Sequence, residues 1–145
     1  MKKKLIIGLL VLISVFTFVG CTSNSKKEKF YELRYVEPKG FKGVIETGTE
    51  ENRLKNFYYG DYDGSINMNY QKGSDYTEIE ELYYNKYTEK EINGTTWRVM
   101  DDETLGVVSR FYYTVYNNNL YLIELNGYDK YKKDMEEFIN NISFE

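Results

Sequence analysis

Histidine and alanine are absent from this chain of 145 residues, and cysteine, proline and tryptophan each occur once. Without histidine, the chain has no Ser-His-Asp triad and no histidine-ligated metal site. A single cysteine excludes an internal disulfide, so the fold must depend on apolar burial. The sequence also has no glycine-rich phosphate loop opening a helix. We therefore expect a non-enzymatic protein with no catalytic residue, no metal site and no cofactor.

The charge balance is acidic. The chain has 19 Lys and Arg residues against 23 Asp and Glu residues, a formal charge of −4. Three of the lysines lie in the first four positions, and the rest of the chain has 16 basic residues and a charge of −7. Binding to nucleic acid requires a basic surface, and so does adhesion to anionic lipid. We expect neither kind of electrostatic partner.

The first twenty residues are typical of a signal peptide. Lys2, Lys3 and Lys4 precede a mostly apolar run from Leu5 to Gly20. As a helix this run would be roughly 24 Å long, which is short for a bilayer core of about 30 Å. A charged start, a short apolar run and a small residue at its end favour cleavage after residue 20.

The run ends in Phe18-Val19-Gly20-Cys21, which resembles the lipobox of bacterial lipoproteins. The resemblance implies that Cys21 is lipidated, with acyl chains such as palmitate, and becomes the N-terminus. Several acyl chains hold a protein firmly, because each buried CH₂ contributes about 0.8 kcal/mol. We expect a protein anchored through Cys21 to the extracytoplasmic face of the cell membrane. The alternative is an uncleaved anchor or an ordinary secretory signal, with Cys21 incidental.

The remaining sequence is long enough for one domain. Residues 21–29 are rich in Ser, Asn and Lys and predict a flexible tether, followed by a single α+β domain over 30–145. Apolar residues recur at helical spacing from Ser74 to near Asn85 and again over 129–141. Asn93-Gly94 is a strong hairpin signal, residues 43–50 predict a loop and residues 60–64 a turn. The expected strands are 30–36, 53–59, 65–71, 89–92, 95–101, 107–116 and 120–126, with a short closing strand at Phe144.

This pattern predicts an antiparallel sheet of six or seven strands flanked by two helices. The order resembles the PsbP-like family, an αβα sandwich also seen in the Mog-type nuclear-import factor. The resemblance covers about residues 30–145 and depends on four segments of the chain. They are the opening run 35–41 with its Pro-x-Gly-Phe bend, the Asn93-Gly94 hairpin leading to Trp97, the tyrosine-rich hairpin 111–123, and Met135-Glu-Glu-Phe-Ile139. The family implies an accessory or binding module, and it brings no catalytic motif.

Two acidic segments have alternative interpretations. Asp61-x-Asp63-Gly64 matches part of a calcium loop, but Tyr59 and Tyr70 stand where the full pattern needs acidic residues, so a simple turn is favoured. Residues 101–103, Asp-Asp-Glu, predict a solvated loop between hairpins, with a catalytic carboxylate pair as the alternative.

The aromatic residues provide the candidate ligand contacts. Tyr58, Tyr59 and Tyr62 lie in and beside a polar turn, and tyrosine is a rigid amphipathic group that stacks on carbohydrate or anchors a protein partner. The alternative is that these side chains fill the core, and that the sixteen tyrosines reflect an AT-rich genome. Trp97, which alternates with Arg98 after a tight turn, is expected to be buried against the helices.

Three functional classes remain open at this point. The first is a monomeric, membrane-tethered binding or accessory domain for an unknown protein or carbohydrate partner. The second is an inhibitor or immunity-type lipoprotein that masks a secreted toxin or hydrolase, for which an acidic surface would suit a basic partner. The third is a carboxylate-based hydrolase of the cell envelope, which would need two carboxylates in one cleft.

Overall fold

A seven-stranded antiparallel sheet organises the domain. The structure, a computed structural model, describes residues 26–83 and 86–145. The expected signal peptide over 1–20 and the lipid site at Cys21 lie outside these residues. The strand order is β3-β4-β5-β9-β8-β7-β6, and every pair is antiparallel. The strands are β3 Gly43–Gly48, β4 Asn52–Tyr59, β5 Gly64–Lys72, β6 Thr88–Ile92, β7 Thr95–Thr104, β8 Val107–Tyr116 and β9 Asn119–Asn126.

A second, three-stranded sheet joins the two ends of the described chain. It contains β1 Lys27–Phe30, β2 Leu33–Val36 and β10 Ser143–Phe144, in the order β1-β2-β10. The prediction of one strand over 30–36 is wrong, because the chain reverses at Tyr31, whose φ is 56°. Since β1 begins at Lys27, residues 27–29 belong to the domain and not to a tether. The expected closing strand at Phe144 is confirmed and pairs with β2.

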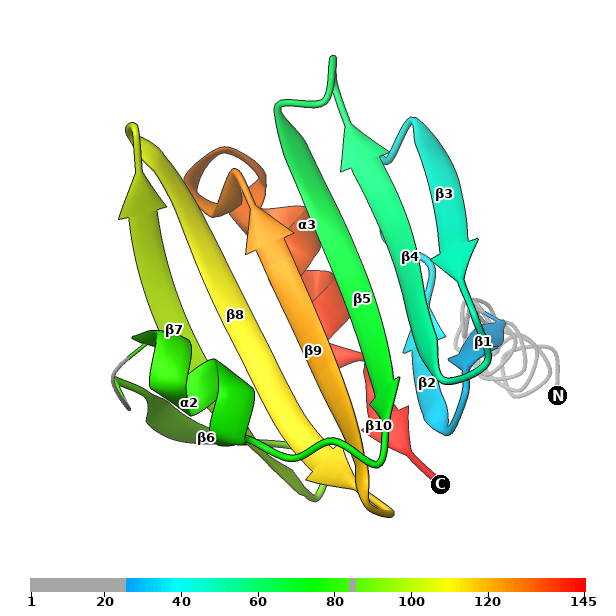
Figure 1. Ribbon diagram of the computed structural model, residues 1–145. Helices are drawn as coiled ribbons and strands as arrows, with labels where there is room; N and C mark the ends of the chain where they lie inside the picture. Colours follow the sequence, from blue (N-terminus) through cyan, green and yellow to red (C-terminus); the bar gives the residue numbers. More distant parts are fainter. Residues whose placement is uncertain (1–25, 84–85) are drawn as a thin grey trace, which may run out of the picture.

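Two helices lie on opposite sides of the larger sheet in the described part of the chain (Figure 1). Helix α2, Thr77–Tyr83, begins after Asp75, whose carboxylate accepts a hydrogen bond of 2.9 Å from the Thr77 backbone N–H. It therefore starts three residues later than the expected Ser74 cap. Helix α3, Tyr128–Asn140, lies within one residue of its predicted bounds. Neither helix has the length and apolarity needed to span a bilayer.

Two further predictions are wrong at the edges of the sheet. The expected loop over 43–50 is mostly strand β3, whose side chains are largely exposed because it is the outermost strand beside β4. The expected loop at 101–103 is the end of β7, which continues to Thr104 in pairing with β8. Exposed strands of this kind do not show the apolar alternation that identifies a half-buried strand.

The two faces of the larger sheet are covered unequally. On one face, α3 and the small sheet bury a large core that includes Tyr35, Phe57, Trp97, Tyr121 and Phe138. On the other face, α2 covers only a smaller cluster: Ile79, Met100, Phe111, Tyr113 and Leu120. The predicted α+β class with an antiparallel sheet and two helices is thus confirmed, while a second sheet was not expected. Beyond α2, no described helix lies over β3, β4 and β5 on this second face (Figure 1).

Candidate functional site

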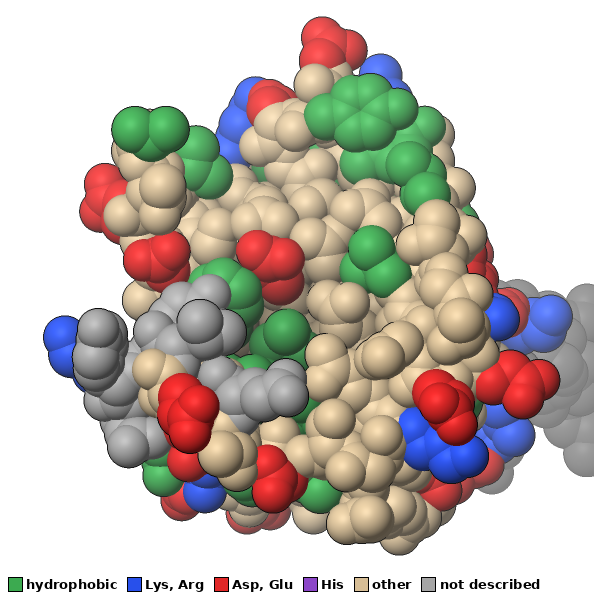
Figure 2. All heavy atoms as spheres, viewed as in Figure 1, with side chains coloured by type: hydrophobic (Ala, Val, Ile, Leu, Met, Phe, Trp, Pro, Cys, Tyr) green, Lys and Arg blue, Asp and Glu red, His purple; other side chains and the backbone are tan. Residues whose placement is uncertain are grey.

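The uncovered part of the second sheet face is the candidate site, and we call it the open face. Strand alternation places most polar side chains of these strands on it, together with Leu54 and Leu122, and the main apolar core on the opposite face. Along β5, for example, Ile66 and Met68 are fully buried, whereas Ser65, Asn67 and Asn69, which alternate with them, are half-buried. Figure 2 shows this face as mostly polar side chains and backbone, with hydrophobic groups at its two upper corners and a few others scattered within it. The polar residues are Asn56, Ser65, Asn67, Asn69, Gln71, Ser109, Glu124 and Asn126.

Cross-strand pairing aligns these side chains into rows. In the central row, Asn56 faces Asn67 and Asn67 faces Glu124. The amide of Asn56 donates to the side-chain oxygen of Asn67, and Asn67 Nδ2 donates to Glu124 Oε2 at 2.9 Å. Because each side chain fixes the next, the row presents its remaining hydrogen-bonding groups in a set orientation.

A second row lies one step closer to the β4–β5 turn. Ser109 Oγ donates to Asn126 Oδ1 at 2.7 Å, and Asn126 Nδ2 donates to Ser65 Oγ at 3.2 Å. Ser65 is paired in register with Tyr58, which continues the row onto β4. The row therefore ends at an aromatic side chain.

Tyr58 and Tyr62 form the aromatic border of the open face. Their rings are stacked, with centroids 4.5 Å apart and planes 19° from parallel. Tyr62 is 71% exposed and has a φ of 66°, an uncommon conformation for a residue other than glycine. The hydrogen bond with the Tyr58 hydroxyl raises the pKa of Tyr62. Next to them, Gly43 leaves room for the Tyr58 ring, since an added Cβ would lie 2.8 Å from Tyr58 Cε1.

The turn that presents Tyr62 is fixed from the buried side of the sheet. Asp63 accepts a hydrogen bond of 2.6 Å from the Tyr131 hydroxyl and forms an ion pair with Lys130. These contacts, the Lys130 hydrogen bond first, lower the pKa of Asp63. The Tyr131 ring in turn stacks on Tyr59, with centroids 4.7 Å apart. Helix α3 thus holds the turn, while the Tyr62 side chain stays largely exposed beside Tyr58.

Of the three predicted ligand contacts, the structure contradicts one. Tyr59 is only 1% exposed and belongs to the main core, where burial raises the pKa of its hydroxyl. It points away from the open face because it follows Tyr58 directly on strand β4. Tyr58 and Tyr62 are brought together. Trp97 is 1% exposed, which confirms its predicted burial, and it stacks on Phe144.

The acidic segments do not come together as a site. Asp61 and Asp63 lie in the β4–β5 turn, as expected, and Asp63 is already bound to α3. In the part of the chain described here, no three acidic or thiol side chains are placed to hold one metal ion. Asp101 and Asp102 follow one another on β7 and so point to opposite faces.

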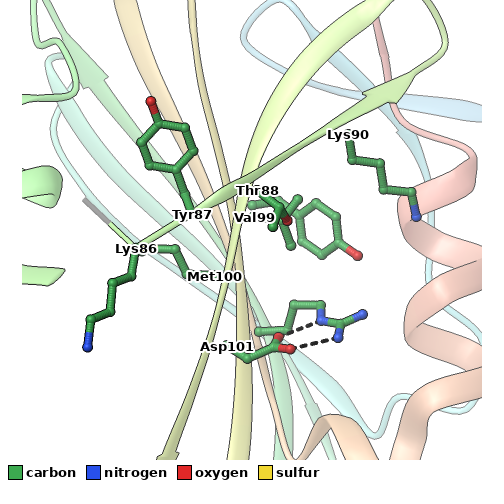
Figure 3. A pocket seen from close by; sticks show the side chains of 9 residues that line it. Lys86, Tyr87, Thr88, Lys90, Val99, Met100 and Asp101 are labelled. Carbon is green, nitrogen blue, oxygen red and sulfur yellow. Dashed lines mark hydrogen bonds and ion pairs between the residues drawn. The ribbon is translucent and has the colours of Figure 1, made fainter. Parts of the chain in front are cut away.

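A hollow of about 490 Å³ lies where β6, β7 and β8 meet. Arg110 donates from Nε and Nη2 to the two oxygens of Asp101, at 2.6 and 2.8 Å, and this hydrogen bonding lowers the pKa of the Asp101 carboxyl. Lys90 points toward α3, whereas Lys86 points in the opposite direction (Figure 3). The lysines therefore do not converge on one anion, and the Asp101–Arg110 pair joins β7 to β8 as a structural contact.

The alternation along β5 is the sequence signal for the open face. Ser65, Asn67, Asn69 and Gln71 alternate with apolar residues, a period-two pattern that places all four on one side of β5. The other open-face residues on β4 and β9 could not have been predicted to join this set. The alignment of Asn56, Glu124 and Asn126 with β5 depends on strand order and register.

Comparison with known proteins gives the fold alone. No family model matches the chain, and no curated protein is significantly similar to it. The fold resembles a crystal structure, at 1.50 Å resolution, of a protein from Bacteroides thetaiotaomicron VPI-5482, with a TM-score of 0.52 at 18% identity. The match covers 79% of this chain and 45% of that one, so the chain spans less than half of its neighbour.

Proposed function

We propose that this protein is a membrane-tethered, extracytoplasmic binding domain without catalytic activity, and that its open face captures the partner. The observation that carries the proposal is the open face itself, a set of aligned polar side chains bordered by an exposed tyrosine. Pre-oriented polar groups beside a rigid aromatic anchor lose little entropy on binding. The lipobox-like run ending in Cys21 supports the anchoring part of the proposal.

The short distance between Cys21 and the domain bears on where binding occurs. Strand β1 begins at Lys27, six residues after Cys21, and six residues span at most about 20 Å. The N-terminal end of the domain would therefore stay close to the membrane. The β4–β5 turn with Tyr62 lies at the other end of the sheet from β1 and β10 (Figure 1), where a partner outside the membrane can reach it.

Site-specific photo-cross-linking in the producing bacterium tests the binding role. A photoreactive amino acid replaces Asn69, on the open face, in the full chain; the matched control replaces Lys133, which is exposed on α3 behind the sheet. We expect a cross-linked adduct from position 69 and none from position 133. No adduct at 69, or equal adducts at both positions, would refute the open face as the binding surface.

Lipid anchoring is tested separately by Cys21→Ser. We expect the variant to incorporate no fatty-acid probe and to persist as an uncleaved precursor, because the thiol is the acceptor of the lipid. Metabolic labelling of the wild type and the variant measures this directly. Equal labelling of both would end the lipoprotein assignment while leaving the cross-linking result unaffected.

A further inference from the structure

We infer that the ligand of the open face is a neutral, hydroxyl-rich glycan, an inference that depends on the proposed binding function. The face offers three features that such a ligand needs together. They are amide groups that both donate and accept hydrogen bonds, a surface without free cations, and an aromatic ring at its border.

The hydrogen-bonding groups match hydroxyls. A sugar hydroxyl donates one hydrogen bond and accepts others, and asparagine and glutamine side chains do both. The side chains of Asn69 and Gln71 make no hydrogen bond with any described residue, and Glu124 uses only Oε2 for Asn67. Two amides of β5 therefore remain available beside the second oxygen of the Glu124 carboxylate, which accepts strong hydrogen bonds from hydroxyl donors.

The charges of the face oppose an anionic ligand. Register places one basic residue, Arg98, on this side of the described sheet, and it is engaged by Glu80 of α2. The acidic residues Glu124 and Asp102 lie on the same side. In Figure 2, Lys and Arg side chains lie at the margins of the face. A sulfated or phosphorylated polymer would meet carboxylates without a neutralising cation, whereas a neutral glycan would not.

The dimensions of the face suit a short stretch of sugar units. Adjacent strands are about 4.8 Å apart, so the row from Tyr58 on β4 to Ser109 on β8 spans about 14 Å. At one end of this row, Tyr62 presents an exposed ring that the stacked Tyr58 supports from beneath. An aromatic ring in this position can stack on the apolar face of a pyranose while the amides bind its hydroxyls.

Native affinity electrophoresis tests the ligand class. The full chain, purified in mild detergent, is run through gels containing dextran, hydroxyethyl cellulose, galactomannan or glycol chitin, each compared with a gel without polysaccharide. Dextran sulfate is the anionic counterpart of dextran. We expect retardation by at least one of the neutral polymers and none by dextran sulfate.

Point variants then locate the binding surface. Tyr62→Ala and Asn69→Ala should each weaken retardation about three- to tenfold, the loss expected for one aromatic contact or one hydrogen bond. Leu105→Ala is the matched control, because Leu105 is 99% exposed on another turn at the same end of the sheet. Equal weakening by the control would place the glycan elsewhere.

The remaining outcomes are also decisive. Failure of all four neutral polymers, or retardation by dextran sulfate alone, would overturn the glycan inference. If position 69 still cross-links to a protein in cells, the binding function stands and only the ligand class is wrong. If neither experiment detects a partner, both proposals fall.

Discussion

Phe144, the penultimate residue, offers a sharp test of how the domain is closed. Its ring is stacked on Tyr116, with centroids 4.2 Å apart, and on Trp97 at 5.8 Å, and it meets Tyr121 edge-on at 4.8 Å. A fully buried phenylalanine replaced by alanine costs about 3–5 kcal/mol. Phe144 is half-buried. We therefore expect Phe144→Ala to lower the free energy of unfolding by about 2 kcal/mol.

Urea unfolding followed by tryptophan fluorescence measures this effect, because Trp97 is the only tryptophan and touches the altered side chain. With a slope of about 2 kcal/mol per molar urea, the midpoint should fall by about 1 M. Trp97 emission in the folded variant should also shift to longer wavelength as water reaches the ring. The measurement uses the chain from Lys26 onward, which we expect to fold as a soluble monomer.

Two further variants make the result interpretable. Phe144→Leu keeps most of the apolar area but no ring, and its midpoint should lie between those of the wild type and the alanine variant. Leu105→Ala, at a fully exposed position, should leave the free energy of unfolding unchanged within about 0.5 kcal/mol. An unchanged midpoint and emission maximum for Phe144→Ala would refute the packing of β10 against the sheet.

Two more predictions follow from the structure. Gly43→Ala should push the Tyr58 ring aside and weaken glycan retardation as much as Tyr62→Ala. In urea unfolding it should lower the free energy of unfolding by under about 1 kcal/mol, because the group that must move is the end of a side chain. The Arg110 hydrogen bonds that lower the pKa of Asp101 stabilise the fold above the carboxyl's ordinary pKa; this contribution is lost as the pH falls below about 4. For Asp101→Asn, the free energy of unfolding should therefore fall less steeply as the pH drops below about 4. The same pH dependence as in the wild type would contradict the ion pair.

Elements with a strong local signal were predictable from the sequence. The Asn93-Gly94 turn joins β6 to β7 as expected, because both residues adopt positive φ, 48° and 82°. Helix α3 was predicted within one residue because its apolar side chains recur on one side. In both cases the physical cause lies within a few residues of the chain, so no knowledge of the rest of the fold is needed.

Elements without a clear apolar pattern of their own were missed. Strand β3 is recognisable only through its pairing with β4, since exposed Val44 and Ile45 sit among polar residues and glycines. At the reversal between β1 and β2, the Tyr31 ring stacks on Tyr70, with centroids 3.7 Å apart. Neither feature shows in a local apolar pattern, because the side chains of β3 are largely exposed and Tyr70 is far from Tyr31 in the sequence.

The candidate site was predictable in part for the same reason. A polar Asp-Gly turn indicates an exposed Tyr62, and the exposure is confirmed. Tyr59 was assigned wrongly because only the fold shows that α3 and Tyr131 lie behind it. The amide rows combine residues from β4, β5 and β9, so they exist only once the three strands are aligned.

The pairing of β2 with β10 has a consequence for how the chain matures. It joins Leu33 to Phe144 and Arg34 to Ser143, contacts that close a loop of more than a hundred residues. During synthesis from the N-terminus, β1 and β2 must wait for the last two strand residues before the small sheet is complete. Long-range closures of this kind slow folding and leave sheet edges exposed in the meantime. A nascent chain that has not yet formed β10 would thus present an unfinished small sheet to chaperones and proteases.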